Sequence, residues 1–226
     1  MIIPTTILTS KEIDKFQRCL NSVISQTECL VICNTLDNDY AKQVETTCST
    51  QPVKYIRTES TGWPSGGKQT VLDHFSKTDY DYLFLIEGDD FIYPNTLEIL
   101  NAMVEKHHPM DILALTNQEV LMGELMTMKE WRSSKLFDDR MKPELEKLPI
   151  DTVRSFLENT QTAIDITGDG INRIVLYSKK GAQIKYDTNV KSGDDFVFGC
   201  EARLLHEKGD ITMYLTNCPE LYVYDQ

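Results

Sequence analysis

The sequence contains no long apolar run: no stretch approaches the ~20 apolar residues that a membrane-spanning helix needs. Its first residues, MIIPTTILTSKEID, have neither the basic segment nor the long apolar core of a secretory signal. We therefore expect no transmembrane segment and no signal peptide, which predicts a cytoplasmic protein.

Basic residues are also scarce, with 23 Lys plus Arg against 35 Asp plus Glu, a net charge of −12 and a pI near 4.8. Broad binding to nucleic acid or to an anionic membrane requires a basic face. We expect neither partner, although a local basic pocket is compatible with this balance.

The six cysteines, at positions 19, 29, 33, 48, 200 and 218, form no C-x-x-C pair and no regular framework. This pattern excludes the usual spacing of a zinc site and of a small disulfide-stapled domain. We predict reduced cysteines that act as small buried apolar residues.

The pattern that is present alternates strands with helices. Residues 5–9, 29–33 and 53–58 read as strands, separated by a helix that Ser10 opens and by a helix over 40–48. This order is typical of right-handed βαβ units and of a parallel sheet.

The alternation continues beyond residue 60, and one region departs from it. We predict helices over 68–75, 96–108 and 192–210, strands over 82–86, 111–116 and 173–178, and strand or turn structure over 181–187. Residues 117–165 lack a sheet pattern, and we interpret them as a helical, lid-like excursion because they are too few to support a core of their own.

The segment LFLIEGDDFIYP places three carboxylates, Glu87, Asp89 and Asp90, directly after an apolar strand. Open α/β sheets bind ligands at the carboxyl ends of their strands. Carboxylates this close together raise one another's pKa unless a cation lies among them, and oxygen ligands of this kind suit Mg²⁺ or Mn²⁺. The alternative is a solvated acidic turn that closes the strand.

A second acidic pair, Asp194 and Asp195, follows Gly193 at the start of a predicted helix. Asp194 fits an N-cap, but two adjacent acids cannot both cap, so one is free to face a cleft and to act as a general base.

The segment from Gly62 to Lys68 satisfies G-x-x-x-x-G-K, the glycine-rich phosphate loop, but has Gln69 where that motif needs Ser or Thr. It leaves open a P-loop-like phosphotransferase or NTPase that uses Lys68, or a simple glycine turn that presents Lys68 to a phosphate.

Five segments in this order together resemble an inverting glycosyltransferase of family 2 with the GT-A fold. They are RCLNSVISQT (18–27), LVICNTLDND (30–39), GGKQTVLDHF (66–75), LIEGDDFIYPNTLEIL (85–100) and SGDDFVFGCEARLLHEKG (192–209). The resemblance implies an α/β domain over 1–226 with a mostly parallel central sheet flanked by helices. Residues 1–116 would bind the nucleotide-sugar, and 117–226 would form the acceptor side.

The resemblance also implies a role for each matching residue. Asp89 and Asp90 would hold Mn²⁺ or Mg²⁺ with the donor diphosphate, and Asp195, with Asp194 beside it, would be the catalytic base. The residues implied to bind the nucleotide-sugar are Thr9, Asn34, Lys68 and Glu87.

The implied activity is metal-dependent, inverting transfer of a sugar from a UDP-, GDP- or dTDP-sugar to a hydroxyl of a glycan or other acceptor. Glu87 departs from the family pattern, which has Asp there, and Asn34-Thr35 replaces the usual acidic pair that recognises uracil. A further alternative is a catalytically silent protein that binds sugar nucleotides on the same fold.

Overall fold

The structure is a computed structural model that describes residues 5–8, 12–60, 62–115, 119–121, 125–127, 130, 173–216 and 221–225. The helices of these residues are α1 (Ile13–Ile24), α2 (Asn38–Ser49), α3 (Pro64–Phe75), α4 (Thr96–Lys106), the short 3₁₀ helix η1 (Gly181–Gln183) and α9 (Asp194–Glu207). The strands are β1 (Thr5–Leu8), β2 (Cys29–Asn34), β3 (Lys54–Thr58), β4 (Tyr82–Glu87), β5 (Ile112–Leu115), β6 (Glu119–Leu121), β7 (Leu125–Thr127), β8 (Arg173–Ser178), β9 (Met213–Thr216) and β10 (Val223–Asp225).

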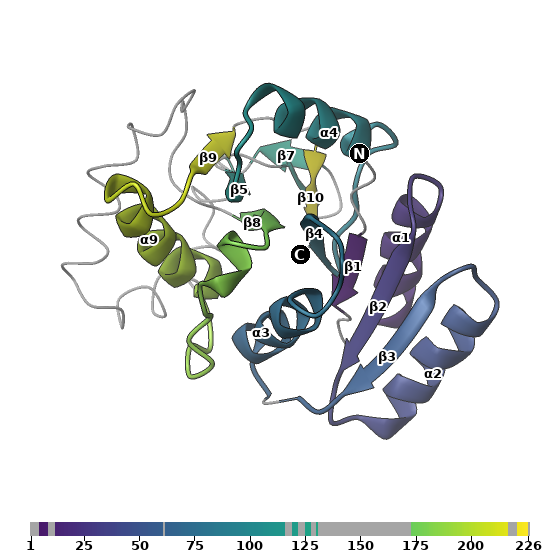
Figure 1. Ribbon diagram of the computed structural model, residues 1–226. Helices are drawn as coiled ribbons and strands as arrows, with labels where there is room; N and C mark the ends of the chain where they lie inside the picture. The colour runs from purple at the N-terminus through teal and green to yellow at the C-terminus, as the bar shows by residue number, and fades with distance from the viewer. Residues whose placement is uncertain are drawn as a thin grey trace.

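A seven-stranded sheet with the order β3-β2-β1-β4-β8-β5-β9 forms the centre of the molecule (Figure 1). Its neighbouring strands run parallel except on the two sides of β8, which is antiparallel to both β4 and β5. The predicted, mostly parallel sheet is therefore confirmed. Because β8 runs against β4, the first residue of β8 lies at the carboxyl end of β4.

Helices cover the sheet on both faces. One core cluster joins α1, α2 and α4 to one face, and a second joins α3, η1 and α9 to the other. Strand β4 contributes side chains to both core clusters, since Phe84 and Ile86 pack in the first cluster while Leu83 and Leu85 pack in the second. This two-sided burial explains why its sequence is apolar without alternation.

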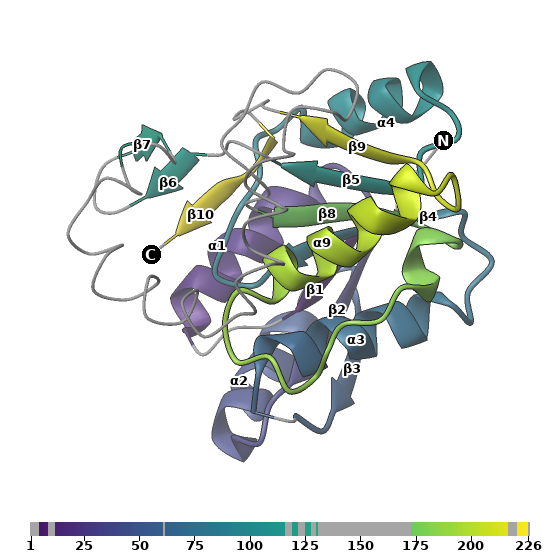
Figure 2. The same cartoon turned by 90° about the vertical axis from the view of Figure 1, so that its left-hand side faces the viewer.

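A second, three-stranded sheet with the order β10-β6-β7 lies beside the main one (Figure 2). Strands β6 and β7 fall within 117–165, so the interpretation of that whole region as a helical excursion is wrong for these residues. Except for residue 130, the rest of the region lies outside the described residues. Three-residue strands carry too little periodicity to be recognised in a sequence.

Several element boundaries also differ from the predictions. Helix α1 begins at Ile13 with Glu12 at its N-cap, two residues after the predicted cap at Ser10, which lies outside the described residues. Residues 181–187, for which strand or turn structure was predicted, form the 3₁₀ turn η1 and an irregular segment after it. The five described cysteines are buried, as predicted, and none of them is part of a disulfide.

Candidate active site

The predicted acidic cluster exists in three dimensions at the carboxyl end of β4. Glu87 is the last residue of β4, and a turn closed by the hydrogen bond from the Asp90 amide to the Glu87 carbonyl (3.1 Å) follows it. Glu87, Asp89 and Asp90 each place one carboxylate oxygen within 4.8 Å of the others. Glu87 and Asp89 are half-buried, and Asp90 is fully buried.

Lys68 of α3 lies at the centre of these acids. Its Nζ is 2.7 Å from Glu87 Oε1 and 2.9 Å from an oxygen of each of Asp194 and Asp195. The side chain is 2% exposed, so Lys68 is a buried counter-ion to three carboxylates. The two acidic segments predicted as separate sites therefore meet at one lysine.

Arg173, the first residue of β8, is the second cation of the site. Its guanidinium lies 2.6 Å from Glu87 Oε1, 3.2 Å from Asp90 Oδ2 and 3.4 Å from Asp195 Oδ2. Sequence reasoning missed Arg173, although a lone arginine at the start of an otherwise apolar strand was a visible signal.

Asp194 and Asp195 occupy the first turn of α9. Gly193, with φ 72°, is the N-cap, so the N-cap interpretation of Asp194 is wrong; glycine suits this left-handed position because it has no Cβ. Asp195 accepts from Lys68 and Arg173 through Oδ2 and from the Tyr186 hydroxyl through Oδ1 at 3.0 Å. Both acids thus point into the cluster.

Tyrosines complete the buried network. The Tyr186 hydroxyl, which donates to Asp195, lies 2.6 Å from the hydroxyl of Tyr177. On the opposite side, the Tyr222 hydroxyl donates to Asp90 Oδ2 at 2.6 Å. No spacing in the sequence marks these tyrosines, because they come from segments without a motif.

The charges of the site are unequal: five carboxylates surround two cations. Burial disfavours the charge of Lys68, but Asp194, Asp195 and Glu87 outweigh it and raise the lysine pKa above its ordinary value. Burial likewise opposes ionisation of Glu87, yet Arg173 and Lys68 lower its pKa to about 2. Glu87 therefore stays ionised as a partner of both cations.

Asp89 and Asp194 behave differently from Glu87. Burial and the charge of Glu87 raise the pKa of Asp89 to about 6. Burial also raises the pKa of Asp194, an effect that Lys68 partly offsets. Within the part of the chain that the structure describes, no cation forms an ion pair with the Asp89 carboxylate. An additional positive charge beside Asp89 would be stabilising.

The glycine-rich segment does not form a phosphate loop. Helix α3 starts at Pro64, with Trp63 at its N-cap, so Gly66 and Gly67 lie within the first helical turns, and Lys68 is enclosed by carboxylates. The predicted loop before residue 68, and the P-loop-like alternative that depended on it, are therefore wrong. Proline at the first helical position favours this earlier start.

Of the other two predicted nucleotide-binding residues, Asn34 ends β2, which β1 separates from β4. Its side-chain amide donates to Thr58 Oγ1 and to the Glu59 carbonyl, both at 2.9 Å. Thr9 lies outside the described residues. The structure thus brings together Lys68, Glu87, Asp89, Asp90, Asp194 and Asp195, and leaves Asn34 at a separate strand end.

The sequence model of Glycosyl transferase family 2 matches residues 6–161. The chain belongs to this glycosyltransferase family. The match covers β1 to β4 with the acidic cluster that follows, which confirms the predicted family. A comparison with curated protein sequences finds no match.

Solved structures of glycosyltransferases share the fold of this family 2 chain. TarS from S. aureus, residues 1–349, matches with a TM-score of 0.62 at 16% identity, over 99% of this chain and 60% of TarS 1–349. The same protein in complex with UDP-GlcNAc matches with a TM-score of 0.62 at 15% identity, over 100% and 59%. A mannosyltransferase from Pyrobaculum calidifontis, in complex with GDP-Man and Mn²⁺, matches with a TM-score of 0.57 at 11% identity, over 99% and 56%.

These matches confirm the GT-A-like fold. The chain spans about 60% of the length of the first of these structures, TarS 1–349. Among the described helices, none has both the length and the apolar character that crossing a membrane requires.

Proposed function

We propose that the protein transfers a sugar, with inversion, from a nucleotide-diphosphate donor to an acceptor hydroxyl, and that a divalent cation assists the reaction. The observation that carries the proposal is the meeting of two acidic segments, Glu87–Asp90 and Asp194–Asp195, at the carboxyl edge of the sheet. Family membership supports it, and so do the related folds solved with UDP-GlcNAc and with GDP-Man and Mn²⁺.

The donor set at the end of β4 fits a hard divalent ion. It consists of oxygen ligands only, and Asp89 has no ion pair with the described cations. Mg²⁺ or Mn²⁺ bound there would neutralise charge on the departing diphosphate. Asp89 is the member of the cluster best able to hold the ion, with Glu87 and Asp90 within reach.

Asp195 is the proposed base. A carboxylate offers about four acceptor directions, and Asp195 uses three of them for Lys68, Arg173 and Tyr186. The remaining direction is available for an acceptor hydroxyl, whose proton Asp195 would take as the oxygen attacks the anomeric carbon. The three donors fix the carboxylate in one orientation, while Asp194 shares Lys68 with it.

The proposal is tested by a thermal-shift screen of UDP-, GDP- and dTDP-sugars with and without Mn²⁺. A donor present at 100 times its dissociation constant stabilises the native state by about 2.7 kcal/mol. We expect one nucleotide class to raise the melting temperature, and to do so more strongly with Mn²⁺. If no sugar nucleotide changes it, the proposed donor class is wrong.

The roles of the residues are tested with Asp195→Asn. We expect loss of transfer with the donor-induced thermal shift retained, whereas the exposed control Asp210→Asn keeps both. If the Asp195→Asn protein still transfers the sugar, Asp195 is not the catalytic base. A wild-type protein that binds a donor without turnover would instead support the silent-binding alternative.

A further inference from the structure

The segment 221–225, which ends in β10, lies directly against the acidic loop. Phe91 follows Asp90 and exchanges two backbone hydrogen bonds with Val223, of 3.2 and 2.9 Å. Thr96, at the start of α4, donates its hydroxyl to the Leu221 carbonyl at 3.0 Å. The segment therefore fixes the chain on the C-terminal side of the loop.

The Tyr222 hydroxyl connects the two ends of the loop. It accepts a hydrogen bond from the Glu87 amide (3.2 Å) and donates to Asp90 Oδ2 (2.6 Å). The Asp225 amide donates to the other oxygen, Asp90 Oδ1, at 3.0 Å. Because Tyr222 and Asp90 are both buried, removing one of these partners would leave a polar group unsatisfied in the interior.

Helix α1 braces the same segment from outside. The Asp225 carboxylate forms ion pairs with Arg18 and, at 3.6 Å, with Lys15. Arg18 also donates to the Asp89 carbonyl at 3.3 Å and lies 4.7 Å from the centre of the Phe91 ring. The backbone of the loop is thus held by α1 and β10 together.

Asp89 and Asp90 differ sharply in this arrangement. Asp90 is 0% exposed, and its oxygens accept from Tyr222, Arg173 and the Asp225 amide. Asp89 is half-buried, and its carboxylate has no ion pair with the cations that the structure describes. A ligand of a bound ion must direct an oxygen toward that ion, and the contacts of Asp90 direct its oxygens into the protein.

We propose that Asp90 is the residue through which β10 fixes the acidic loop, that Tyr222 is its positioning partner, and that Asp89 is the carboxylate left to face a bound cation. This inference assigns Asp90 a role other than the metal ligation that its motif implies. Its last part rests on the proposed function, whereas the anchoring of the loop does not.

Hydrogen exchange tests the anchor in the full chain. Tyr222→Phe removes only the hydroxyl, and we expect the Glu87 amide to exchange about fivefold faster, because one neutral hydrogen bond is lost. The matched control is Tyr80→Phe, which removes an exposed hydroxyl that bonds Glu28. Unchanged exchange at Glu87 in Tyr222→Phe would overturn the role of Tyr222.

Electron paramagnetic resonance of added Mn²⁺ tests the division between the two aspartates. We expect Asp89→Asn to lose Mn²⁺ binding while its melting temperature does not fall. Asp90→Asn should lower the melting temperature and speed exchange at Phe91. Tyr222→Phe should weaken Mn²⁺ binding by about tenfold, as for the loss of other residues that orient ligands.

Two results would contradict the assignment. In the first, the Asp90→Asn protein loses Mn²⁺ binding as fully as the Asp89→Asn protein but keeps the melting temperature and the exchange rates of the wild type. That result would make Asp90 a ligand of the ion. In the second, the Asp89→Asn protein binds Mn²⁺ as the wild type does. If the wild-type protein binds no Mn²⁺, the metal in the proposed function and the role of Asp89 both fail, and hydrogen exchange alone decides the anchor.

Discussion

Replacing Asp89 by asparagine should stabilise the protein in the absence of metal. Burial and the neighbouring Glu87 raise the pKa of Asp89 from its ordinary 3.8 to about 6. Such an acid binds its proton more tightly in the folded state than in the unfolded state, so its ionisation lowers the free energy of unfolding at any pH above 6. Asparagine keeps the shape of the side chain and removes that cost.

The size of this effect follows from the shift. Two pKa units correspond to about 3 kcal/mol, and partial exposure of Asp89 reduces the expected gain to about 1–3 kcal/mol. For a chain of this length, 1 kcal/mol moves the melting temperature by about 2–4 °C. We therefore expect Asp89→Asn to melt roughly 2–12 °C higher than the wild type at pH 7.5.

The pH dependence gives the sharper test. As the pH falls through 6 toward 4, wild-type Asp89 takes up its proton, and the difference between the two proteins should disappear. Added Mn²⁺ should stabilise the wild type and leave Asp89→Asn unchanged. The control Asp210→Asn removes an equal charge from an exposed position and should show neither effect. An Asp89→Asn protein that melts no higher than the wild type at pH 7.5, or a gain that persists at pH 4, would refute the reasoning.

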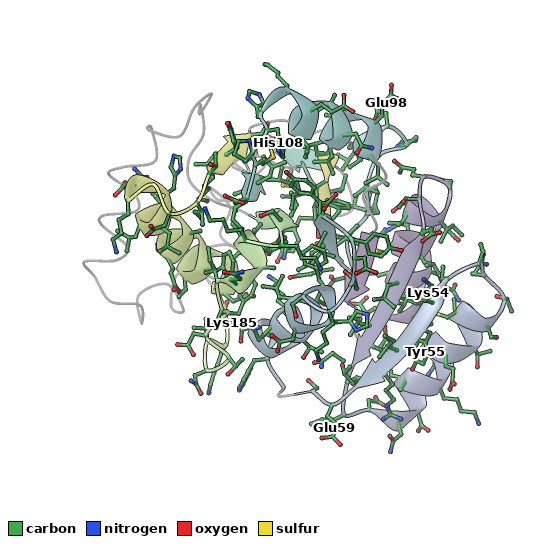
Figure 3. All side chains as sticks on the ribbon, viewed as in Figure 1. Lys54, Tyr55, Glu59, Glu98, His108 and Lys185 are labelled. Atoms are coloured by element: carbon green, nitrogen blue, oxygen red, sulfur yellow. The ribbon has the colours of Figure 1, made fainter. Side chains whose placement is uncertain are left out.

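Two further predictions concern stability. Lys68→Met removes a buried cation that Glu87, Asp194 and Asp195 share and should cost about 3–5 kcal/mol in urea unfolding. Lys185, which lies beside α3 (Figure 3), forms an exposed ion pair with Asp73 of that helix, and Lys185→Met should cost at most about 1 kcal/mol. Equal losses would show that Lys68 is not the main counter-ion of the site. Gly181→Ala would place a Cβ 2.1 Å from the Asp111 carbonyl oxygen and should destabilise the protein by about 1–3 kcal/mol; an unchanged unfolding midpoint would show that η1 moves to make room.

The sequence was sufficient for the parts of the fold that rest on local periodicity. Strand β4 is apolar on both faces because it is buried on both faces, and strand β8 was predicted with the bounds that it has. The start of α3 was not predicted, because Gly66 and Gly67 suggest a turn by composition, while Pro64 and the packing of the buried helix decide otherwise.

The acidic residues of the site were predictable for a similar reason, since each group follows a strand or opens a helix. The side chains that bind these acids could not be predicted. Arg173 reaches Asp90 across 83 positions of the chain, and Tyr222 reaches it across 132. Contacts of this kind depend on which strands become neighbours, and the antiparallel placement of β8 between β4 and β5 leaves no mark in a single sequence.

The long sequence separation of Arg173 from Glu87 and Asp90, and of Lys68 from Asp194 and Asp195, also bears on synthesis. A ribosome completes the Glu87–Asp90 loop long before it reaches Arg173, and Lys68 is paired with Asp195 across 127 positions. A chain that has been made only as far as β4 therefore has the acidic loop without Arg173, Asp195 or Tyr222. The order of translation thus keeps the site unformed until β8, α9 and β10 have been made, and a nascent chain should not bind ligand before that point.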